Sequence, residues 1–253
     1  MSMMNISRNI QECIKRRAYD KTGNSTAPEG TTNRFRQAYE DNPLYGTENM
    51  VTMAKCVLAG GAKGIRACWP ENVRAIRALT DAPLIGINKV MPSADTDFYD
   101  SVFITPNYES AVAVIEAGCD VVALDGTLRG RNEKELTELV QRLKAAYPDI
   151  VLMADLATVE EGIICEKAGF DILSSTLSGY TRDTMHNNLG GPDIQLIREL
   201  KSRTSCLVNG EGKIWDSKQL RDVWAAGADM VTMGSAITNP MKTTAYLIEQ
   251  MKK

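Results

Sequence analysis

The 253-residue sequence contains a single histidine and no apolar stretch approaching the length of a membrane span. Its six cysteines form no CxxC pair, so no spacing typical of metal ligands is present and no metal is expected. Lysine and arginine (29) do not outnumber aspartate and glutamate (32), and nucleic-acid binders normally need such a basic excess. These absences exclude a membrane-spanning protein, a zinc-cluster protein and a nucleic-acid binder.

The remaining composition is that of a globular protein, with 43% hydrophobic and 24% charged residues. Residues 1–17 lack an apolar core of the signal-peptide type. Most of the scattered cysteines lie in apolar periodic segments, which favours buried, reduced thiols and a cytoplasmic location. We expect residues 1–30 to form a helix and a polar loop, followed by a single domain over residues 31–253.

A short motif recurs four times, at 59–67, 116–125, 167–176 and 225–234, and reads as a helix end, a glycine and a short apolar strand. Such αβ junctions alternate with helical patterns. The strands are apolar on both faces, as in a parallel sheet covered by helices. No GxGxxG follows an early strand, which disfavours an open doubly wound sheet. The pattern therefore predicts an α/β fold, a (β/α)8 TIM barrel of the phosphate-binding type. Its clear strands are expected at 63–66, 84–88, 121–124, 151–154, 172–175, 205–209 and 230–233.

The first strand is the exception to this pattern. The candidate segment, TTNRFRQ at 31–37, contains one large apolar residue, Phe35, and follows a polar segment rich in turn formers. We therefore expect an irregular or degraded first strand. Its neighbours would have unpaired edges unless residues 1–20 or a partner chain cover the gap.

Polar residues follow almost every predicted strand, at the end of the barrel where active sites lie. They are Gln37, Arg66, Lys89, Asp125, Asp155, Ser175, Thr176, Glu211, Gly234 and Ser235. Each alone could be a solvated charge or a buried ion pair that closes the barrel. As a set they indicate a site, in which we assign Gln37, Arg66, Asp125 and Asp155 to substrate binding.

Two glycine-containing turns point to the kind of ligand. Gly212-Lys213 follows the seventh strand, and Gly234-Ser235 follows the eighth, just before a helix start. The loops after these two strands commonly bind phosphate through unobstructed backbone N–H groups. The sequence therefore predicts a phosphorylated small-molecule ligand, although tight turns alone would also explain the glycines.

Lys89 and Glu211 form the best candidate catalytic pair. Lys89 ends an apolar strand, where partial desolvation favours the neutral amine, and Glu211 lies between two glycines after the seventh strand. An amine and a carboxylate that face one substrate can move protons at carbon and oxygen. A Schiff base on Lys89 remains an alternative. His186 receives no role, and the long polar loop over 178–191 is a candidate lid.

Several fragments carry a family resemblance. GGAKGIRA, PLIGINK, VVALDGTLRGR, LMADLATVEEG, SSTLSGYT, NGEGKI and MGSAITNP, in this order, are similar to segments of the N-acetylmannosamine-6-phosphate 2-epimerases. The resemblance spans about residues 37–250. It implies a (β/α)8 barrel that interconverts N-acetylmannosamine 6-phosphate and N-acetylglucosamine 6-phosphate in sialic acid catabolism, without a cofactor. It also implies that Lys89 and Glu211 are catalytic, that Gln37, Arg66 and Asp155 contact the sugar, and that the 212–213 and 234–235 loops hold the phosphate.

The sequence departs from the family pattern at a few positions. Val90 follows the lysine where a basic residue is usual, and Asn239 replaces a usual arginine. The common Ala-Glu-Gly reads Gly210-Glu211-Gly212, after Asn209. Two rival functions therefore stay open: an isomerase or aldolase acting on another phosphorylated sugar, and a catalytically silent phosphosugar-binding protein. We expect a homodimer.

Overall fold

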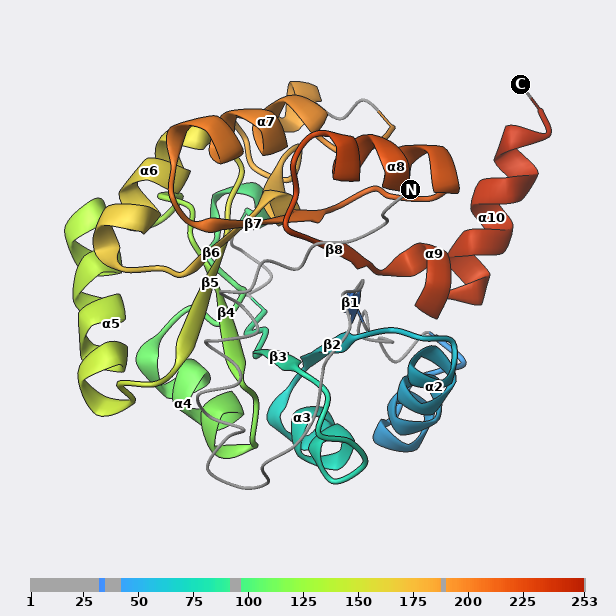
Figure 1. Cartoon of the computed structure of the whole chain (residues 1–253), viewed down its shortest axis with the longest axis horizontal. Helices are drawn as coiled ribbons and strands as arrows, with labels where there is room; N and C mark the ends of the chain where they lie inside the picture. Colours follow the sequence, from blue (N-terminus) through green and yellow to red (C-terminus); the bar gives the residue numbers. More distant parts are fainter. Residues whose placement is uncertain (1–31, 35–41, 92–96, 188–189, 253) are drawn as a thin grey trace.

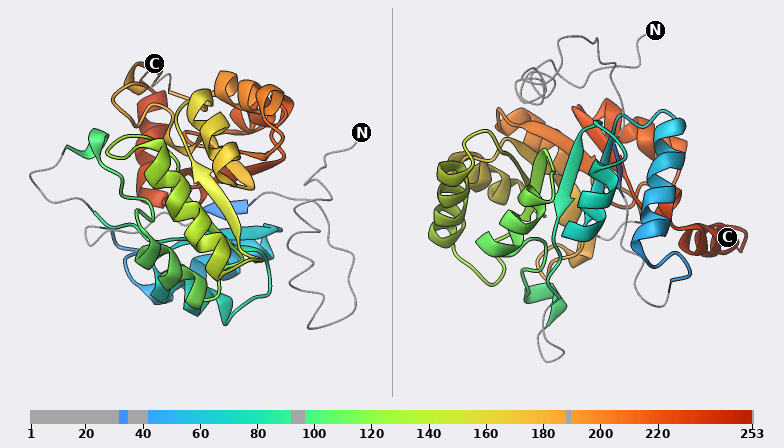
Figure 2. Two further views of the ribbon diagram at one scale, coloured as in Figure 1. Left: turned by 90° about the vertical axis from the view of Figure 1, so that its left-hand side faces the viewer. Right: turned by 90° about the horizontal axis from the view of Figure 1, so that it is seen from below.

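The computed structural model describes residues 32–34, 42–91, 97–187 and 190–252. Eight parallel strands close into a barrel in sequence order, with helices around the outside (Figures 1 and 2). The strands are β1 (Thr32–Arg34), β2 (Gly64–Cys68), β3 (Leu84–Ile87), β4 (Val121–Asp125), β5 (Val151–Asp155), β6 (Ile172–Ser174), β7 (Leu207–Glu211) and β8 (Met230–Met233). The predicted (β/α)8 barrel is confirmed.

Nine α-helices are described. They are α2 (Thr47–Ala59), α3 (Pro70–Arg77), α4 (Tyr108–Glu116), α5 (Glu133–Ala146), α6 (Val159–Ala168), α7 (Ile194–Arg203), α8 (Ser217–Ala225), α9 (Ser235–Thr238) and α10 (Pro240–Gln250). Reciprocal capping boxes begin α4, α5 and α6, and each satisfies backbone N–H groups that the first helical turn leaves unbonded. The starts of these three helices therefore have a local physical cause.

The first strand is short, as its polar sequence predicts. β1 has three residues, which pair with β2 at three positions and with β8 at two. β4 and β5, by contrast, pair at five positions. β1 therefore closes the barrel, and the expected gap is not present. The helix and loop predicted over 1–30, and Phe35 and Gln37, lie outside the described residues, so the proposed domain boundary stays a prediction.

The barrel interior changes from apolar to polar along the strands. Inward-facing Ile85, Val121, Met153, Ile172 and Met230 form a buried apolar cluster in the interior. Several other buried positions of the strands carry polar side chains. These are Arg66, Asp125, Asp155, Ser174, Asn209, Glu211 and Thr232, all nearly inaccessible to solvent. The buried polar groups thus gather toward the carboxyl ends of the strands, the end where barrels of this kind bind ligands.

The cysteines only partly follow the sequence interpretation. The five described ones are free thiols, and Cys68, Cys119 and Cys165 are buried. Cys206 is half-buried, and burial raises its pKa to about 12. Cys56 is exposed on α2, so the expectation of buried thiols is wrong for that residue. Cys13 lies outside the described residues.

The last helix, α10, differs from the others because none of its residues is buried. It extends away from the barrel beyond α9 (Figure 1). Met241, Leu247, Ile248 and Met251 are large apolar side chains on or next to this helix that remain exposed. Neither α10 nor any other helix in the described part of the chain is long and apolar enough to cross a membrane.

Candidate active site

Three charged side chains from three strands are in contact inside the barrel, toward the carboxyl ends of the strands. Arg66 Nη1 donates to Asp155 Oδ1 at 2.9 Å and to Glu211 Oε2 at 2.9 Å, and Arg66 Nη2 pairs with Asp155 Oδ2. The side chains of all three residues are essentially inaccessible to solvent. The sequence placed each residue at a strand end, and the structure brings these three into direct contact.

Charge and hydrogen bonding fix the orientation of this cluster. Burial opposes the charge of the Arg66 guanidinium, but the carboxylates of Asp155 and Glu211 outweigh it and hold the Arg66 pKa above its usual value. The hydroxyl of Thr176 donates to Asp155 Oδ1 at 2.7 Å. The cluster therefore holds one cation and two carboxylates, an arrangement that can orient hydroxyl groups of a ligand and accept protons.

Ser175 fixes the backbone that carries Glu211. Its hydroxyl donates to the Glu211 carbonyl oxygen at 2.9 Å and accepts from the Glu211 N–H at 3.1 Å. Gly212, the next residue, has φ +108°, a conformation that side-chain-bearing residues rarely adopt. The glycine after Glu211 is thus explained by the turn that directs the chain away from the strand end.

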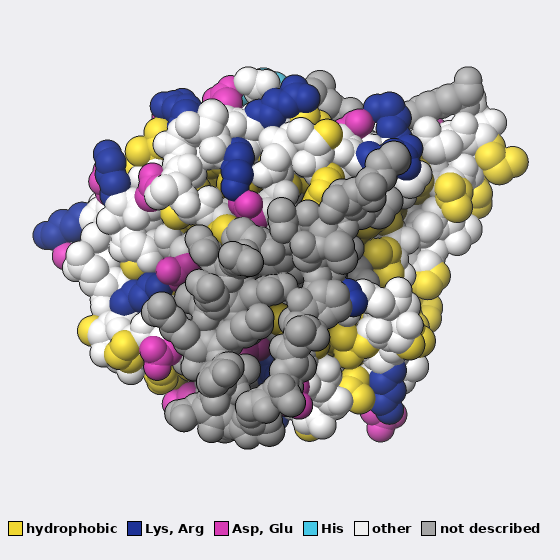
Figure 3. Space-filling view, in the orientation of Figure 1, with side chains coloured by type: hydrophobic (Ala, Val, Ile, Leu, Met, Phe, Trp, Pro, Cys, Tyr) yellow, Lys and Arg dark blue, Asp and Glu magenta, His cyan; other side chains and the backbone are white. Residues whose placement is uncertain are grey.

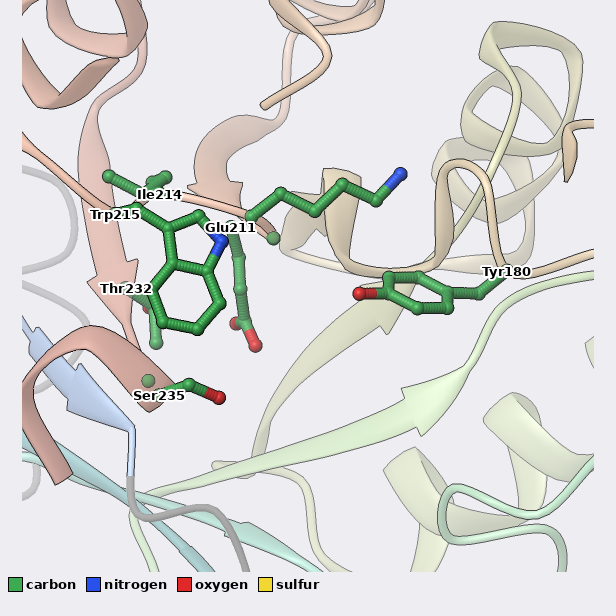
Figure 4. Close-up of a pocket in the computed structure, with 9 residues that line it drawn as sticks. Tyr180, Glu211, Ile214, Trp215, Thr232 and Ser235 are labelled. Atoms are coloured by element: carbon green, nitrogen blue, oxygen red, sulfur yellow. The ribbon is translucent and has the colours of Figure 1, made fainter. Parts of the chain in front are cut away.

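A pocket with about 410 Å³ of empty space lies beside this cluster. It is lined by Tyr180, Glu211, Gly212, Lys213, Ile214, Trp215, Thr232, Gly234 and Ser235. Figure 4 shows Glu211 between Trp215, Thr232 and Ser235 on one side and Tyr180 on the other. All four residues predicted to bind phosphate, Gly212, Lys213, Gly234 and Ser235, therefore lie on the same pocket as Glu211.

Lys213 contributes to the pocket in a way the sequence does not reveal. Its ammonium group donates to the Ser178 carbonyl oxygen at 3.0 Å and lies 4.9 Å from the centroid of the Tyr180 ring. Burial lowers the Lys213 pKa, and the charge of Asp193 partly opposes this. The side chain thus connects the turn after β7 to the loop after β6, and its role in phosphate binding stays a prediction.

Lys89 lies just beyond the end of β3 and is not among the residues that line this pocket. It forms an isolated antiparallel bridge with Ile104, and its carbonyl oxygen accepts from Trp69 Nε1 at 3.2 Å. Its ammonium group lies 5.5 Å from the centroid of the Phe103 ring. The backbone around Lys89 is thus fixed from two sides, while its pairing with Glu211 on one substrate stays a prediction.

Asp125 ends β4 and is fully buried. Its carboxylate accepts from the Thr127 N–H at 3.1 Å, from the Thr127 hydroxyl at 2.6 Å and from Arg129 Nη2 at 2.7 Å. Arg129 also donates to the Tyr180 carbonyl oxygen at 3.1 Å. Asp125 therefore organises the neighbouring loops, and its predicted contact with substrate stays a prediction.

Several residues that line the pocket could not be identified as site residues from the sequence. Trp215 lines the pocket and also stacks on Tyr246 of α10, with ring centroids 4.6 Å apart. Tyr180 and Thr232 complete the lining. The only sequence signal for Trp215 was its position three residues after Gly212.

Gly210 is explained by packing behind the site. A Cβ atom at this position would overlap Cγ1 of Val223, a buried residue of α8. We expect Gly210→Ala to lower the free energy of unfolding by about 1–3 kcal/mol, since extra volume in a packed core forces neighbours to move. Urea denaturation measures this. Adding Val223→Ala should recover part of the loss, and an undiminished loss in the double variant would refute the packing explanation.

Known proteins resemble the chain over most of its length. A solved structure of the N-acetylmannosamine-6-phosphate 2-epimerase from Clostridium perfringens superposes with a TM-score of 0.78 at 32% identity, covering 87% of this chain and 93% of that one. A thiamine phosphate pyrophosphorylase from Pyrococcus furiosus, at 20% identity and a TM-score of 0.54, covers 88% of this chain and 94% of its own. The second likeness shows the barrel fold alone.

Sequence relatives give the same result. A protein of Listeria monocytogenes is 35% identical over 219 residues, covering 86% of this chain and 92% of its own length. One of Caldanaerobacter subterraneus is 38% identical over 218 residues, covering 86% and 89%. Both are named "Putative N-acetylmannosamine-6-phosphate 2-epimerase". Residues 50–253 match the family described as "Putative N-acetylmannosamine-6-phosphate epimerase". The chain, whose barrel carries the buried Arg66–Asp155–Glu211 cluster, therefore belongs to this epimerase family.

Proposed function

We propose that the protein is an isomerase that interconverts N-acetylmannosamine 6-phosphate and N-acetylglucosamine 6-phosphate by moving the proton at C2. The observation that carries the proposal is the position of Glu211, which lines the pocket formed by the turns after β7 and β8 and is in contact with Arg66. Family membership supports the same chemistry. A 6-phosphate held by the glycine turns would direct the sugar toward the carboxylate.

The proposed reaction begins with opening of the sugar ring to its aldehyde, because the carbonyl at C1 acidifies the proton at C2. Lys89 or Glu211 removes this proton, and the electron pair moves toward the carbonyl oxygen to give an enolate that carries the acetamido group on C2. A proton then returns to C2 on the opposite face, and the second group of the pair assists ring opening or supplies that proton. Arg66 and Asp155 orient the hydroxyl and acetamido groups.

The proposal includes a cellular setting. The reaction requires no cofactor, since both proton transfers use side chains of this chain. We place it in sialic acid and amino sugar catabolism, in the cytoplasm. Support for the location comes from the free thiols of the five described cysteines, which suit a reducing compartment.

Incubation with N-acetylmannosamine 6-phosphate in heavy water tests the reaction directly. We expect N-acetylglucosamine 6-phosphate to form with one deuterium at C2, as measured by proton NMR. Neither epimer nor deuterium at C2 would contradict the proposal. Borohydride trapping of a covalent adduct on Lys89 would instead favour Schiff-base chemistry on another phosphorylated sugar, and tight binding without turnover would favour a silent phosphosugar-binding protein.

We also propose a homodimer that uses α10. Figure 3 shows apolar side chains gathered on the right-hand side of the molecule, where α10 lies. Leu247 on α10 is 57% exposed, and Met251, directly after the helix, is 86% exposed, while α10 itself has no buried residue. A clustered apolar surface of this kind is typical of an interface.

Light scattering after size-exclusion chromatography tests the dimer. We expect the native chain to have twice the mass of one chain, and Leu247→Glu to shift the equilibrium toward the monomer by placing a charge in the apolar contact. Glu249→Gln, on the same helix, is the matched control and should leave the mass unchanged. A monomeric native protein would contradict this proposal.

A further inference from the structure

We propose that Asn209 is a positioning residue for Glu211, and this inference rests on the proposed function. Asn209 lies two residues before Glu211 on β7, so both side chains point into the barrel. Asn209 Nδ2 donates to Glu211 Oε2 at 3.2 Å, the same oxygen that accepts from Arg66 Nη1 at 2.9 Å. The amide and the guanidinium thus hold one oxygen of the carboxylate from two directions.

The amide itself is held by neighbouring strands. Nδ2 also donates to the Ser174 hydroxyl on β6 at 2.7 Å, and Oδ1 accepts from the Thr232 hydroxyl on β8 at 2.9 Å. Because the Glu211 carboxylate can only accept, the Nδ2 end of the amide faces it, and Oδ1 is then held by the Thr232 hydroxyl. Asn209 therefore cannot rotate without losing hydrogen bonds on both sides.

The same bonds connect the two carboxylates by a second route. The Ser174 and Thr176 hydroxyls lie 2.8 Å apart, and Thr176 donates to Asp155 Oδ1 at 2.7 Å. A buried chain of hydrogen bonds therefore runs from Glu211 through Asn209, Ser174 and Thr176 to Asp155, in addition to the direct connection through Arg66. Asparagine suits this position because its amide both donates and accepts, whereas an apolar residue would remove one hydrogen bond from each of the two buried hydroxyls.

A second observation distinguishes this role from simple packing. Asn209 is fully buried below the pocket and is not among the residues that line it. Asn209 can therefore affect a substrate only through neighbours such as Glu211 and Thr232, which it contacts and which line the pocket. The titratable groups described around Glu211 are Arg66 on β2, Asp155 on β5, and Tyr180 and Lys213 on the loops of the pocket.

Asn209→Asp tests the inference with almost no change in shape. It replaces an N–H donor with a carboxyl group at about the same distance from Glu211, and two carboxyl groups in contact cannot both ionise easily. We expect the two groups to titrate as a coupled pair, with at least one apparent pKa raised by about one unit or more over native Glu211. Carbon-13 NMR of glutamate-labelled protein measures this without substrate, with the Glu211 signal assigned from its loss in Glu211→Gln.

The turnover assay supplies the second readout. We expect the acid limb of the kcat/KM profile to move to higher pH by the same amount, while KM at high pH changes little. Asn72→Asp is the matched control, since Asn72 is also buried but donates to the Cys68 carbonyl oxygen at 2.9 Å and lines a different pocket. That variant should leave the Glu211 titration unchanged.

The outcomes separate this inference from the proposed reaction. If Asn209→Asp shifts the Glu211 titration but the native protein has no epimerase activity, the positioning role is supported and the proposed reaction is refuted. An unshifted titration in an active enzyme refutes the positioning role. If Asn209→Asp does not fold, Thr232→Val replaces it: losing the hydroxyl that fixes the amide should also move the Glu211 titration, and no movement overturns the inference.

Discussion

Replacing Glu211 by glutamine is expected to lower kcat by about 10²–10⁴-fold, the usual contribution of a positioned acid or base. Glutamine keeps the size of the side chain and can still accept a hydrogen bond from Arg66, but it cannot take a proton. The barrel should therefore remain folded. Deuterium exchange at C2 of the substrate, measured separately from epimer formation, shows whether proton removal itself is lost.

Two further variants make this result interpretable. Lys89→Met should cause a loss of similar size, because it removes the second group of the proposed pair. Glu161→Gln alters another, half-buried carboxylate, one that accepts from backbone N–H groups of Ala157, Thr158 and Leu128. This control should cost stability and leave kcat near the native value. Native kcat in Glu211→Gln would contradict the catalytic assignment.

Replacing Arg66 by methionine is expected to lower the free energy of unfolding by about 3–5 kcal/mol, because it leaves two buried carboxylates without their cation. Arg66 is fully buried and contacts both Asp155 and Glu211. Urea denaturation at neutral pH measures the loss. The loss should shrink as the pH falls, since protonation removes the uncompensated negative charges in the folded variant.

Matched substitutions test whether burial is the cause. Arg203→Met breaks an exposed ion pair with Glu160, whose atoms lie 3.4 Å apart, and should cost no more than about 1 kcal/mol. Adding Asp155→Asn and Glu211→Gln to Arg66→Met should recover much of the stability, because no buried charge then remains. Equal losses for the exposed and buried arginines would refute this account of the cluster.

Much of the barrel could be predicted because its signals are local. Short strands that are apolar on both faces, and glycines at helix ends, specify βα repeats without any knowledge of distant contacts. The strand ends then place Arg66, Asp155 and Glu211 at one end of the barrel. Their direct contact could not be predicted, since it depends on the inward direction and length of three side chains from separate strands.

The less predictable residues share a physical reason. Lys213 follows the expected turn, but four rotatable bonds let its ammonium reach Tyr180, away from the turn itself. In the sequence, Asn209 is only a polar residue within a strand. Its role depends on hydrogen bonds to Ser174 and Thr232, which lie on the two neighbouring strands. Trp215 contacts both the pocket and α10, a long-range relation that a local pattern does not encode.

The short first strand has a consequence for how the molecule opens. The three described residues of β1 pair with β2 at three positions and with β8 at two, and two is also the number of paired positions between β3 and β4. Local unfolding begins where the fewest contacts stabilise the structure. We therefore expect amide hydrogens along the seam formed by β1 and its two neighbouring strands to exchange with solvent before those between β4 and β5. The seam separates the strand of Arg66 from the strand that leads to Gly234 and Ser235. A lightly paired part of the barrel thus lies between the ion cluster and one side of the pocket, and the described residues of β1 connect the two.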